Sequence, residues 1–85
     1  MKHYVYVVYN NRHNKFYIGQ TEDLIERINA HNDKRFRGSY TSKFDGEWQL
    51  IYSESLNNRP DAIVREKQLK SYRGREFIKQ NIIPR

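Results

Sequence analysis

The strongest constraint on the fold lies at the N-terminus, where two strand patterns flank a short polar run. Residues 4–9 are aromatic or β-branched throughout, and a second strand pattern covers residues 15–19. The polar run between them is rich in asparagine, which tolerates the positive φ angles of tight turns. A hairpin with its tip at residues 11–12 would place Tyr6 directly opposite Tyr17. Such an aromatic pair stabilises a sheet by roughly 0.2–1 kcal/mol, so simple packing already explains two tyrosines on one face.

Periodicity and capping residues predict the remaining elements of the chain. These are a helix from an N-cap at Thr21 to about Asn32, a basic loop over 33–46, a strand over 48–53, a helix from about Asp61 to Tyr72 that Gly74 ends, and a short helix over 75–80. The order β-β-α-β-α-α predicts one small α+β domain over residues 1–85, with a three-stranded β-sheet flanked by helices.

Composition excludes several classes of protein. The chain has no cysteine, which removes disulfides, thiolate metal sites and cysteine nucleophiles. No stretch approaches the roughly 18 apolar residues that span a bilayer, and the N-terminus runs directly into a strand pattern that leaves no room for a signal peptide. We therefore expect a cytoplasmic protein with no membrane partner.

The net charge of +6 favours a nucleic acid as partner, although charge can also serve solubility alone. Basic residues with interleaved aromatic residues crowd the 33–46 loop, and more basic residues fill the C-terminal third. The candidate nucleic-acid contacts are Lys34, Arg35, Arg37, Tyr40, Lys43, Lys70 and Arg73. Phe36 and Tyr40 can stack on unpaired bases, which would favour flaps, ends or single strands, or they can simply hold the loop against the body.

Three polar residues lie in or beside apolar helix stripes. On the first helix, Arg27 and His31 border the stripe, where an arginine commonly snorkels and a histidine is commonly satisfied by neighbouring polar groups. On the second, Glu66 lies about 40° from Ala62, inside the stripe that faces the core. A buried carboxylate is costly without compensation. An i,i+4 pair with Lys70 does not by itself explain that position, so we interpret Glu66 as a functional carboxylate.

Other kinds of site lack support in the sequence. The three histidines show no zinc-ligand spacing, and the four glycines form no phosphate-binding fingerprint. Ser39, Thr41 and Ser42 lie near no obvious base, so a hydrolase triad is not indicated.

The combined pattern resembles the GIY-YIG nucleases, and the match covers residues 4 to about 80. Tyr4-Val5-Tyr6 and Tyr17-Ile18-Gly19 look like the paired motif of that family, Arg27 and His31 follow on the next helix, and Glu66 lies in the run Ala62-Ile63-Val64-Arg65-Glu66-Lys67-Gln68-Leu69-Lys70. This run is similar to that of short single-domain bacterial members. Each tripeptide alone is a weak signal, whereas the set is specific.

The resemblance implies a DNA phosphodiesterase that uses one divalent cation, Mg²⁺ or Mn²⁺. It implies that Glu66 binds the metal, Tyr6 approaches the attacking water, Tyr17 orients the site and Arg27 contacts the scissile phosphate, while His31 matches a site position that is His or Tyr in relatives. Two departures are Tyr4 in place of the first glycine and Gln20 in place of a lysine found in some relatives, which loses one cationic contact. No motif anchors Asn81, although a late asparagine supports the site in some relatives.

Several points stay open at the level of sequence. The general base is Tyr6, Tyr17 or His31. A tyrosine with a pKa near 10 is ionised to only about one part in a thousand at pH 7, so a histidine with a pKa near 6.5 is chemically the easier proton acceptor. The predicted function is a metal-dependent DNA endonuclease, structure-selective and active in DNA repair or processing, acting as a monomer or with a separate targeting partner; RNA is left open. The alternatives are a nucleic-acid-binding module without useful activity and an interaction protein whose aromatic hairpin docks a partner.

Overall fold

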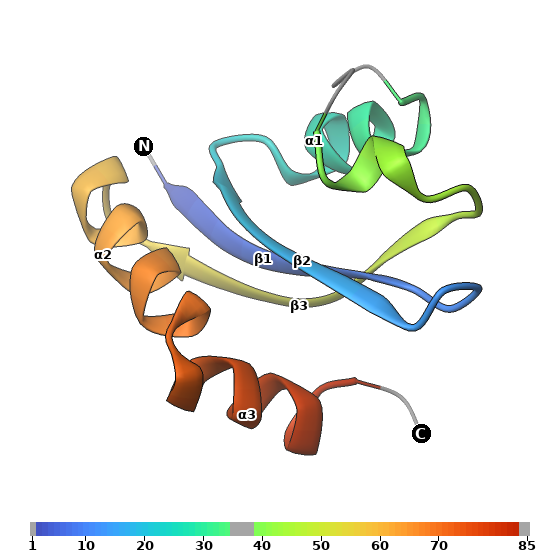
Figure 1. The fold of residues 1–85 in the computed structure, drawn as a ribbon. Helices are drawn as coiled ribbons and strands as arrows, with labels where there is room; N and C mark the ends of the chain where they lie inside the picture. Colours follow the sequence, from blue (N-terminus) through green and yellow to red (C-terminus); the bar gives the residue numbers. More distant parts are fainter. Residues whose placement is uncertain (1, 35–38, 84–85) are drawn as a thin grey trace.

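A computed structural model describes residues 2–34 and 39–83 of the chain, and its path is drawn in Figure 1. The elements are β1 (His3–Asn10), β2 (Lys15–Thr21), α1 (Leu24–Asn32), the 3₁₀ helix η1 (Thr41–Lys43), β3 (Trp48–Leu56), α2 (Arg59–Lys70) and α3 (Tyr72–Asn81). The predicted α+β class and the order β-β-α-β-α-α are confirmed. The third strand is three residues longer than predicted, because it stays paired with β1 as far as Leu56.

The sheet has the order β2-β1-β3 with antiparallel pairing throughout, so β1 is central and β2 lies at one edge. The hairpin register differs from the predicted one: Tyr6 pairs with Gly19, and Tyr17 pairs with Val8. The turn holds four residues instead of two, with Asn14 at a φ of 53° and its side chain accepting a 2.7 Å hydrogen bond from the Tyr9 hydroxyl. Tyr6 and Tyr17 therefore share a face as diagonal neighbours, and the expectation that they face each other directly is wrong.

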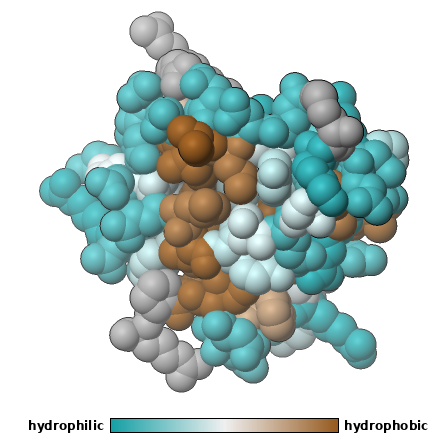
Figure 2. All heavy atoms as spheres, turned by 180° about the vertical axis from the view of Figure 1, so that it is seen from behind, coloured by the Kyte–Doolittle hydropathy of each residue, from teal (hydrophilic) through white to brown (hydrophobic). Residues whose placement is uncertain are grey.

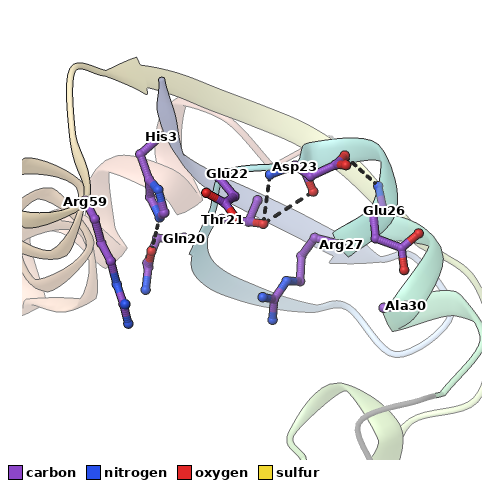
Figure 3. A pocket seen from close by; sticks show the side chains of 9 residues that line it. All are labelled: His3, Gln20, Thr21, Glu22, Asp23, Glu26, Arg27, Ala30 and Arg59. Atoms are coloured by element: carbon purple, nitrogen blue, oxygen red, sulfur yellow. Dashed lines mark hydrogen bonds between the residues drawn. The ribbon is translucent and has the colours of Figure 1, made fainter. Parts of the chain in front are cut away.

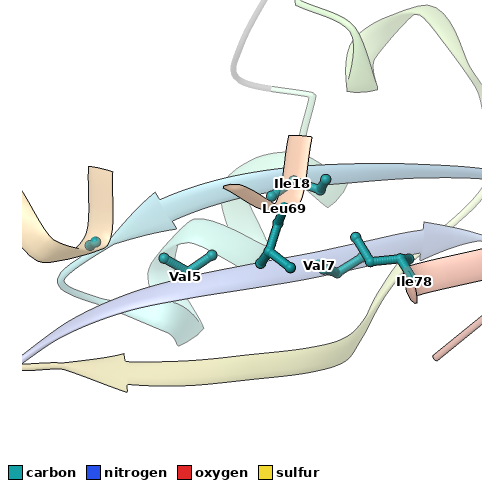
Figure 4. Packing of buried hydrophobic residues seen from close by; sticks show 6 residues of the cluster. Val5, Val7, Ile18, Leu69 and Ile78 are labelled. Carbon is teal, nitrogen blue, oxygen red and sulfur yellow. The ribbon is translucent and has the colours of Figure 1, made fainter. Parts of the chain in front are cut away.

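Each face of the sheet carries its own apolar cluster, because side chains alternate along a strand. One cluster joins Val5, Val7 and Ile18 to residues of α2 and α3, among them Leu69 and Ile78 (Figure 4). The other joins Tyr6, Val8 and Trp48 to side chains of α1 and of the segment around η1. The sheet thus separates α1 and η1 on one side from α2 and α3 on the other (Figure 1).

The helix boundaries follow from capping side chains that the sequence pattern misplaced. Asp23, not Thr21, caps α1, since its carboxylate accepts a hydrogen bond from Glu26 N at 3.1 Å. The second helix ends at Lys70 because Ser71 is extended, and the Ser71 hydroxyl then caps α3 through Gly74 N.

Gly74 lies inside the first turn of α3, so the prediction that it terminates a helix is wrong. A Cβ there would lie 2.5 Å from Leu69 Cα, so glycine is needed for the close approach of α3 to α2.

The face turned away from the view of Figure 1 shows a strip of hydrophobic side chains between hydrophilic ones (Figure 2). Ile25, Leu50 and Val64 are among the large apolar residues that remain exposed in the molecule. A domain of this size cannot cover all of its apolar surface with polar atoms. Within the described residues, no helix has the length and apolar character needed to cross a membrane.

Candidate active site

The Tyr6 side chain crosses the neighbouring strand and carries its hydroxyl to the edge of the sheet. Tyr6 pairs with Gly19 of β2, and its ring is almost completely buried. A Cβ at position 19 would lie within 2.6 Å of Tyr6 Cζ and would also overlap the hydroxyl. Glycine at this position is therefore what allows the Tyr6 hydroxyl to reach the β2 edge.

His31, in the last turn of α1, holds the Tyr6 hydroxyl in place. Its Nε2 lies 2.9 Å from Tyr6 Oη, and its Nδ1 lies 2.9 Å from Thr41 Oγ1. The Thr41 carbonyl in turn accepts a hydrogen bond from the buried Trp48 indole. The expectation that no base lies near the hydroxyls of the 39–42 segment is wrong for Thr41. Spacing gave no signal for this contact, because the loop brings together two residues ten positions apart.

Burial lowers the pKa of His31 to about 4, and the positive charges of Arg27 and Lys34 act in the same direction. The imidazole is therefore neutral at pH 7. One ring nitrogen then donates a hydrogen bond while the other accepts one. The two contacts are satisfied if Tyr6 donates to Nε2 and Nδ1 donates to Thr41.

This titration gives a testable dependence of stability on pH. Above pH 6.5 the histidine is neutral in both the folded and the unfolded chain. Between pH 6.5 and about 4 only the unfolded chain binds the proton at this position, so the free energy of unfolding falls as the pH falls. We expect His31 to account for a loss of about 2–3 kcal/mol on going from pH 7.5 to pH 4.

Urea unfolding at several pH values would measure this loss. His31→Gln, which can keep both hydrogen bonds, should show a shallower fall by that amount. Equal slopes for the wild type and His31→Gln would contradict a neutral, buried His31.

Tyr17 and Lys70 connect this cluster to the helices on the other side of the sheet. The Tyr17 ring lies 6.5 Å from the Tyr6 ring and 5.3 Å from the His31 ring, measured between centroids. Lys70 Nζ lies 5.9 Å from the Tyr17 centroid and 3.0 Å from Glu66 Oε1. Since α2 packs on the face opposite Tyr17, Lys70 reaches around the β2 edge.

Glu66 is largely buried, with 18% of its side chain exposed. This agrees with its position in the apolar stripe, and the i,i+4 pair with Lys70 is present as well. The carboxylate therefore lies at the edge of the sheet with a positive charge beside it. It does not point into bulk solvent.

Three residues singled out from the sequence, Tyr17, Arg27 and Glu66, influence the pKa of the Tyr6 hydroxyl. Burial, above all, raises the pKa of Tyr6, and the nearby Tyr17 and Glu66 raise it too, whereas Arg27 lowers it. Tyr6 is consequently protonated at neutral pH in the free protein. A tyrosinate acting as general base is thus disfavoured in this state, which narrows the choice that the sequence left open.

Arg27 lines an open cleft of about 570 Å³ between the start of α1 and the start of α2 (Figure 3). Its guanidinium and that of Arg59 extend to the same side of the cleft in this view. Gln20 forms a side-chain hydrogen bond with His3. The rest of the lining includes Glu22, Asp23 and Glu26, so the cleft is of mixed charge. Nothing in the sequence pattern pointed to Arg59.

The residues predicted to contact nucleic acid do not all lie at the candidate active site around Tyr6. Lys34 donates hydrogen bonds to the carbonyls of Phe44 and Gly46, and Arg73 lines a separate depression at the α2–α3 junction. Tyr40 and Lys43 are exposed near η1, and Tyr40 and Lys70 line one depression with Tyr17. Asn81 is exposed and donates to the Phe77 carbonyl of its own helix. Arg35, Phe36 and Arg37 lie outside the described residues.

The side chains present fit a weakly held divalent cation. Among residues 2–34 and 39–83, no three histidine or acidic side chains gather into a metal cluster, so Glu66 offers a single carboxylate. Mg²⁺ is commonly bound by one or two carboxylates together with waters and substrate phosphates. One carboxylate beside Lys70 is consistent with a metal that binds well only when the substrate completes its coordination.

A small α+β fold thus brings Tyr6, Tyr17 and Glu66 near the β2 edge, with Arg27 close enough to lower the pKa of Tyr6. The chain belongs to the GIY-YIG catalytic domain family, whose model matches residues 2–80. Members of this family are in general nucleases and in general use divalent metal ions.

The related proteins are small UPF0213 proteins. One from Staphylococcus saprophyticus is 30% identical over 78 residues, which is 92% of each chain. Another, from Pediococcus pentosaceus, is 39% identical over 72 residues, covering 80% of this chain and 73% of the relative. The solution NMR structure of the UPF0213 protein BH0048 from Bacillus halodurans has a TM-score of 0.53 at 26% identity and covers 94% of this chain and 84% of that one.

Proposed function

We propose that this protein is a metal-dependent DNA endonuclease that hydrolyses phosphodiester bonds and serves DNA repair or processing. The observation that carries the proposal is the environment of the Tyr6 hydroxyl. This hydroxyl is hydrogen-bonded to the neutral His31. Besides burial, Tyr17 and Glu66 raise its pKa, and Arg27 lowers it. Packing alone does not require a carboxylate and an arginine close enough to influence the pKa of a buried tyrosine hydroxyl.

Glu66 would hold one Mg²⁺ or Mn²⁺ ion, which when bound stabilises the negative charge that develops on the phosphate oxygens. Arg27 would bind the scissile phosphate, because its planar guanidinium matches two phosphate oxygens at once. Lys70, which lies beside Glu66, would add a positive charge next to the bound DNA strand. Tyr17 would hold the Tyr6 and His31 rings in position through its contacts with both.

The proton of the attacking water would leave through Tyr6 and His31. As the water oxygen bonds to phosphorus and the bond to the leaving sugar oxygen breaks, the water proton passes to Tyr6 Oη while the Tyr6 proton passes to His31 Nε2. In the free protein, a histidine with a pKa of about 4 is a weak acceptor. Burial is the main cause of that low pKa, and the charge of Arg27 adds to it. A phosphate bound at Arg27 would offset the contribution of Arg27 and so raise the basicity of His31.

The proposal is tested by incubating the protein with branched, flapped, single-stranded and duplex DNA in Mg²⁺, in Mn²⁺ or in chelator. We expect cleavage in either metal, none in chelator, and a preference for DNA with unpaired nucleotides. Salt-dependent binding without cleavage of any substrate would instead identify a binding module that keeps the fold. Absence of both binding and cleavage would reject a role on DNA altogether.

A further inference from the structure

A depression of about 260 Å³ lies directly beside the candidate active site, on the outer side of β2. It is lined by Phe16, Tyr17 and Ile18 of β2, by Tyr40, by Lys70 of α2 and by Arg75 of α3. Tyr17 belongs both to this depression and to the cluster around Tyr6. Anything bound here would therefore contact a residue of that cluster.

Two of the aromatic rings that line this depression stack on each other. The planes of Tyr17 and Tyr40 are inclined by only 22°, and their centroids are 6.3 Å apart, which is within the usual range of stacked aromatic pairs. The Tyr17 ring therefore supports the Tyr40 ring. Tyr40 is 40% exposed, although its ring is supported by edge contact with Phe44, 5.3 Å away. A half-exposed tyrosine supported from behind offers a rigid apolar surface at low entropic cost.

The two charged residues that line the depression, Lys70 and Arg75, are both cationic, and Lys70 is also paired with Glu66. Lys70 Nζ lies 5.9 Å from the Tyr17 centroid, and the Arg75 guanidinium lies 5.9 Å from the Phe16 centroid. No acidic residue lines this depression within the described part of the chain, in contrast to the cleft at Arg27. Aromatic surfaces flanked by cations are the features that bind a nucleobase together with its phosphate.

We propose that this depression is a subsite for one unpaired nucleobase of the bound strand, stacked on the half-exposed Tyr40 ring, with its phosphate near Lys70 and Arg75. This inference rests on the proposed action on DNA and adds to it the feature that the substrate must present. A fully paired duplex can offer an unstacked base only at an unstacking cost of a few kcal/mol. The subsite thus selects single strands, flaps or flipped-out nucleotides.

The test measures binding in chelator, so that cleavage plays no part. The probe is an oligonucleotide with a fluorescent 2-aminopurine at one position, compared with the same oligonucleotide carrying an abasic site there. We expect quenching of the 2-aminopurine when the wild type binds at one position of the strand. Tyr40→Ala should weaken binding by about tenfold, since stacking is worth roughly 1–3 kcal/mol per base. Tyr40→Phe should bind as the wild type does.

The abasic strand separates stacking from a general loss of structure. On that strand the penalty of Tyr40→Ala should vanish, because the base that it contacts is gone. Tyr72→Ala, a substitution of a tyrosine that is 79% exposed and does not line the depression, is the matched control and should leave binding unchanged. Arg75→Gln should weaken binding on both strands and reduce its dependence on salt.

If Tyr40→Ala weakened binding equally on the normal and abasic strands, the subsite would be overturned. Binding of a free mononucleotide as tightly as the oligonucleotide would overturn it as well. Base quenching without cleavage in Mg²⁺ or Mn²⁺ would keep the subsite and reject the endonuclease. Cleavage by Tyr40→Ala at the wild-type rate would keep the endonuclease and reject the subsite.

Discussion

Replacing Glu66 with glutamine is expected to abolish metal-dependent cleavage, with a rate at least about 1000-fold below that of the wild type. The substitution keeps the shape of the side chain but removes the single carboxylate charge that can hold the cation. Glu66 is largely buried at the sheet edge, and no neighbouring acidic cluster within the described residues can take over its role. The reaction should then lose the charge stabilisation that the cation supplies, which is worth several kcal/mol.

The fold should survive this substitution. Lys70 loses its partner, but 44% of its side chain is exposed, so water can solvate the ammonium group. We expect the free energy of unfolding to change by less than about 1 kcal/mol. Cleavage of labelled DNA in Mg²⁺ and urea unfolding of the same preparations measure both effects.

Glu76→Gln is the matched control for the first prediction. Glu76 also pairs with a lysine on a helix, Lys79, at 3.9 Å, but it neither lines the depression at Tyr17 nor influences the pKa of Tyr6. It should cut DNA at the wild-type rate. If the Glu66 and Glu76 variants were equally active, the assignment of Glu66 as metal ligand would be refuted.

Replacing Tyr6 with phenylalanine is expected to reduce the cleavage rate by about 100-fold or more while DNA binding in chelator stays unchanged. The ring, its position over Gly19 and its contacts with Tyr17 are retained. Only the hydroxyl is lost, and with it the hydrogen bond to His31 Nε2. The water then lacks both its acceptor and the route by which its proton reaches the histidine.

A cost in stability accompanies this loss, because a buried ring nitrogen of His31 is left without its Tyr6 partner. We expect a destabilisation of about 1–2 kcal/mol, too small to unfold the protein at room temperature. Tyr9→Phe controls for this cost. Tyr9 is a buried tyrosine of the same strand whose hydroxyl donates to Asn14, away from the site.

The comparison of the two tyrosine variants decides the role of Tyr6. The Tyr9 variant should lose a similar amount of stability and keep its activity. Equal loss of activity in both would mean that cleavage follows stability, and the role assigned to the Tyr6 hydroxyl would be wrong.

The order of the elements was predictable because it rests on local patterns. The strand at residues 4–9 and the periodicity of the helices depend on neighbouring residues in the chain. The errors arose where such a local pattern fits more than one structure. A tip of two residues and one of four fit the same polar run, and the choice depends on Asn14 adopting a positive φ and bonding to Tyr9. Likewise, Gly74 resembles a helix terminator until α2 is seen packed against it.

Helical periodicity was enough to place Glu66 in the apolar stripe of its helix and Arg27 and His31 at the border of theirs, because it sets the angular position of each side chain. It could not show that side chains from opposite faces of the sheet meet at the β2 edge. That meeting depends on Tyr6 crossing Gly19 and on Lys70 reaching around the strand, both of which follow from the register and from the packing of α2. Long-range packing also joined Thr41 to His31 and placed Tyr40 beside Tyr17. Contacts of this kind arise between distant segments, and no local spacing encodes them.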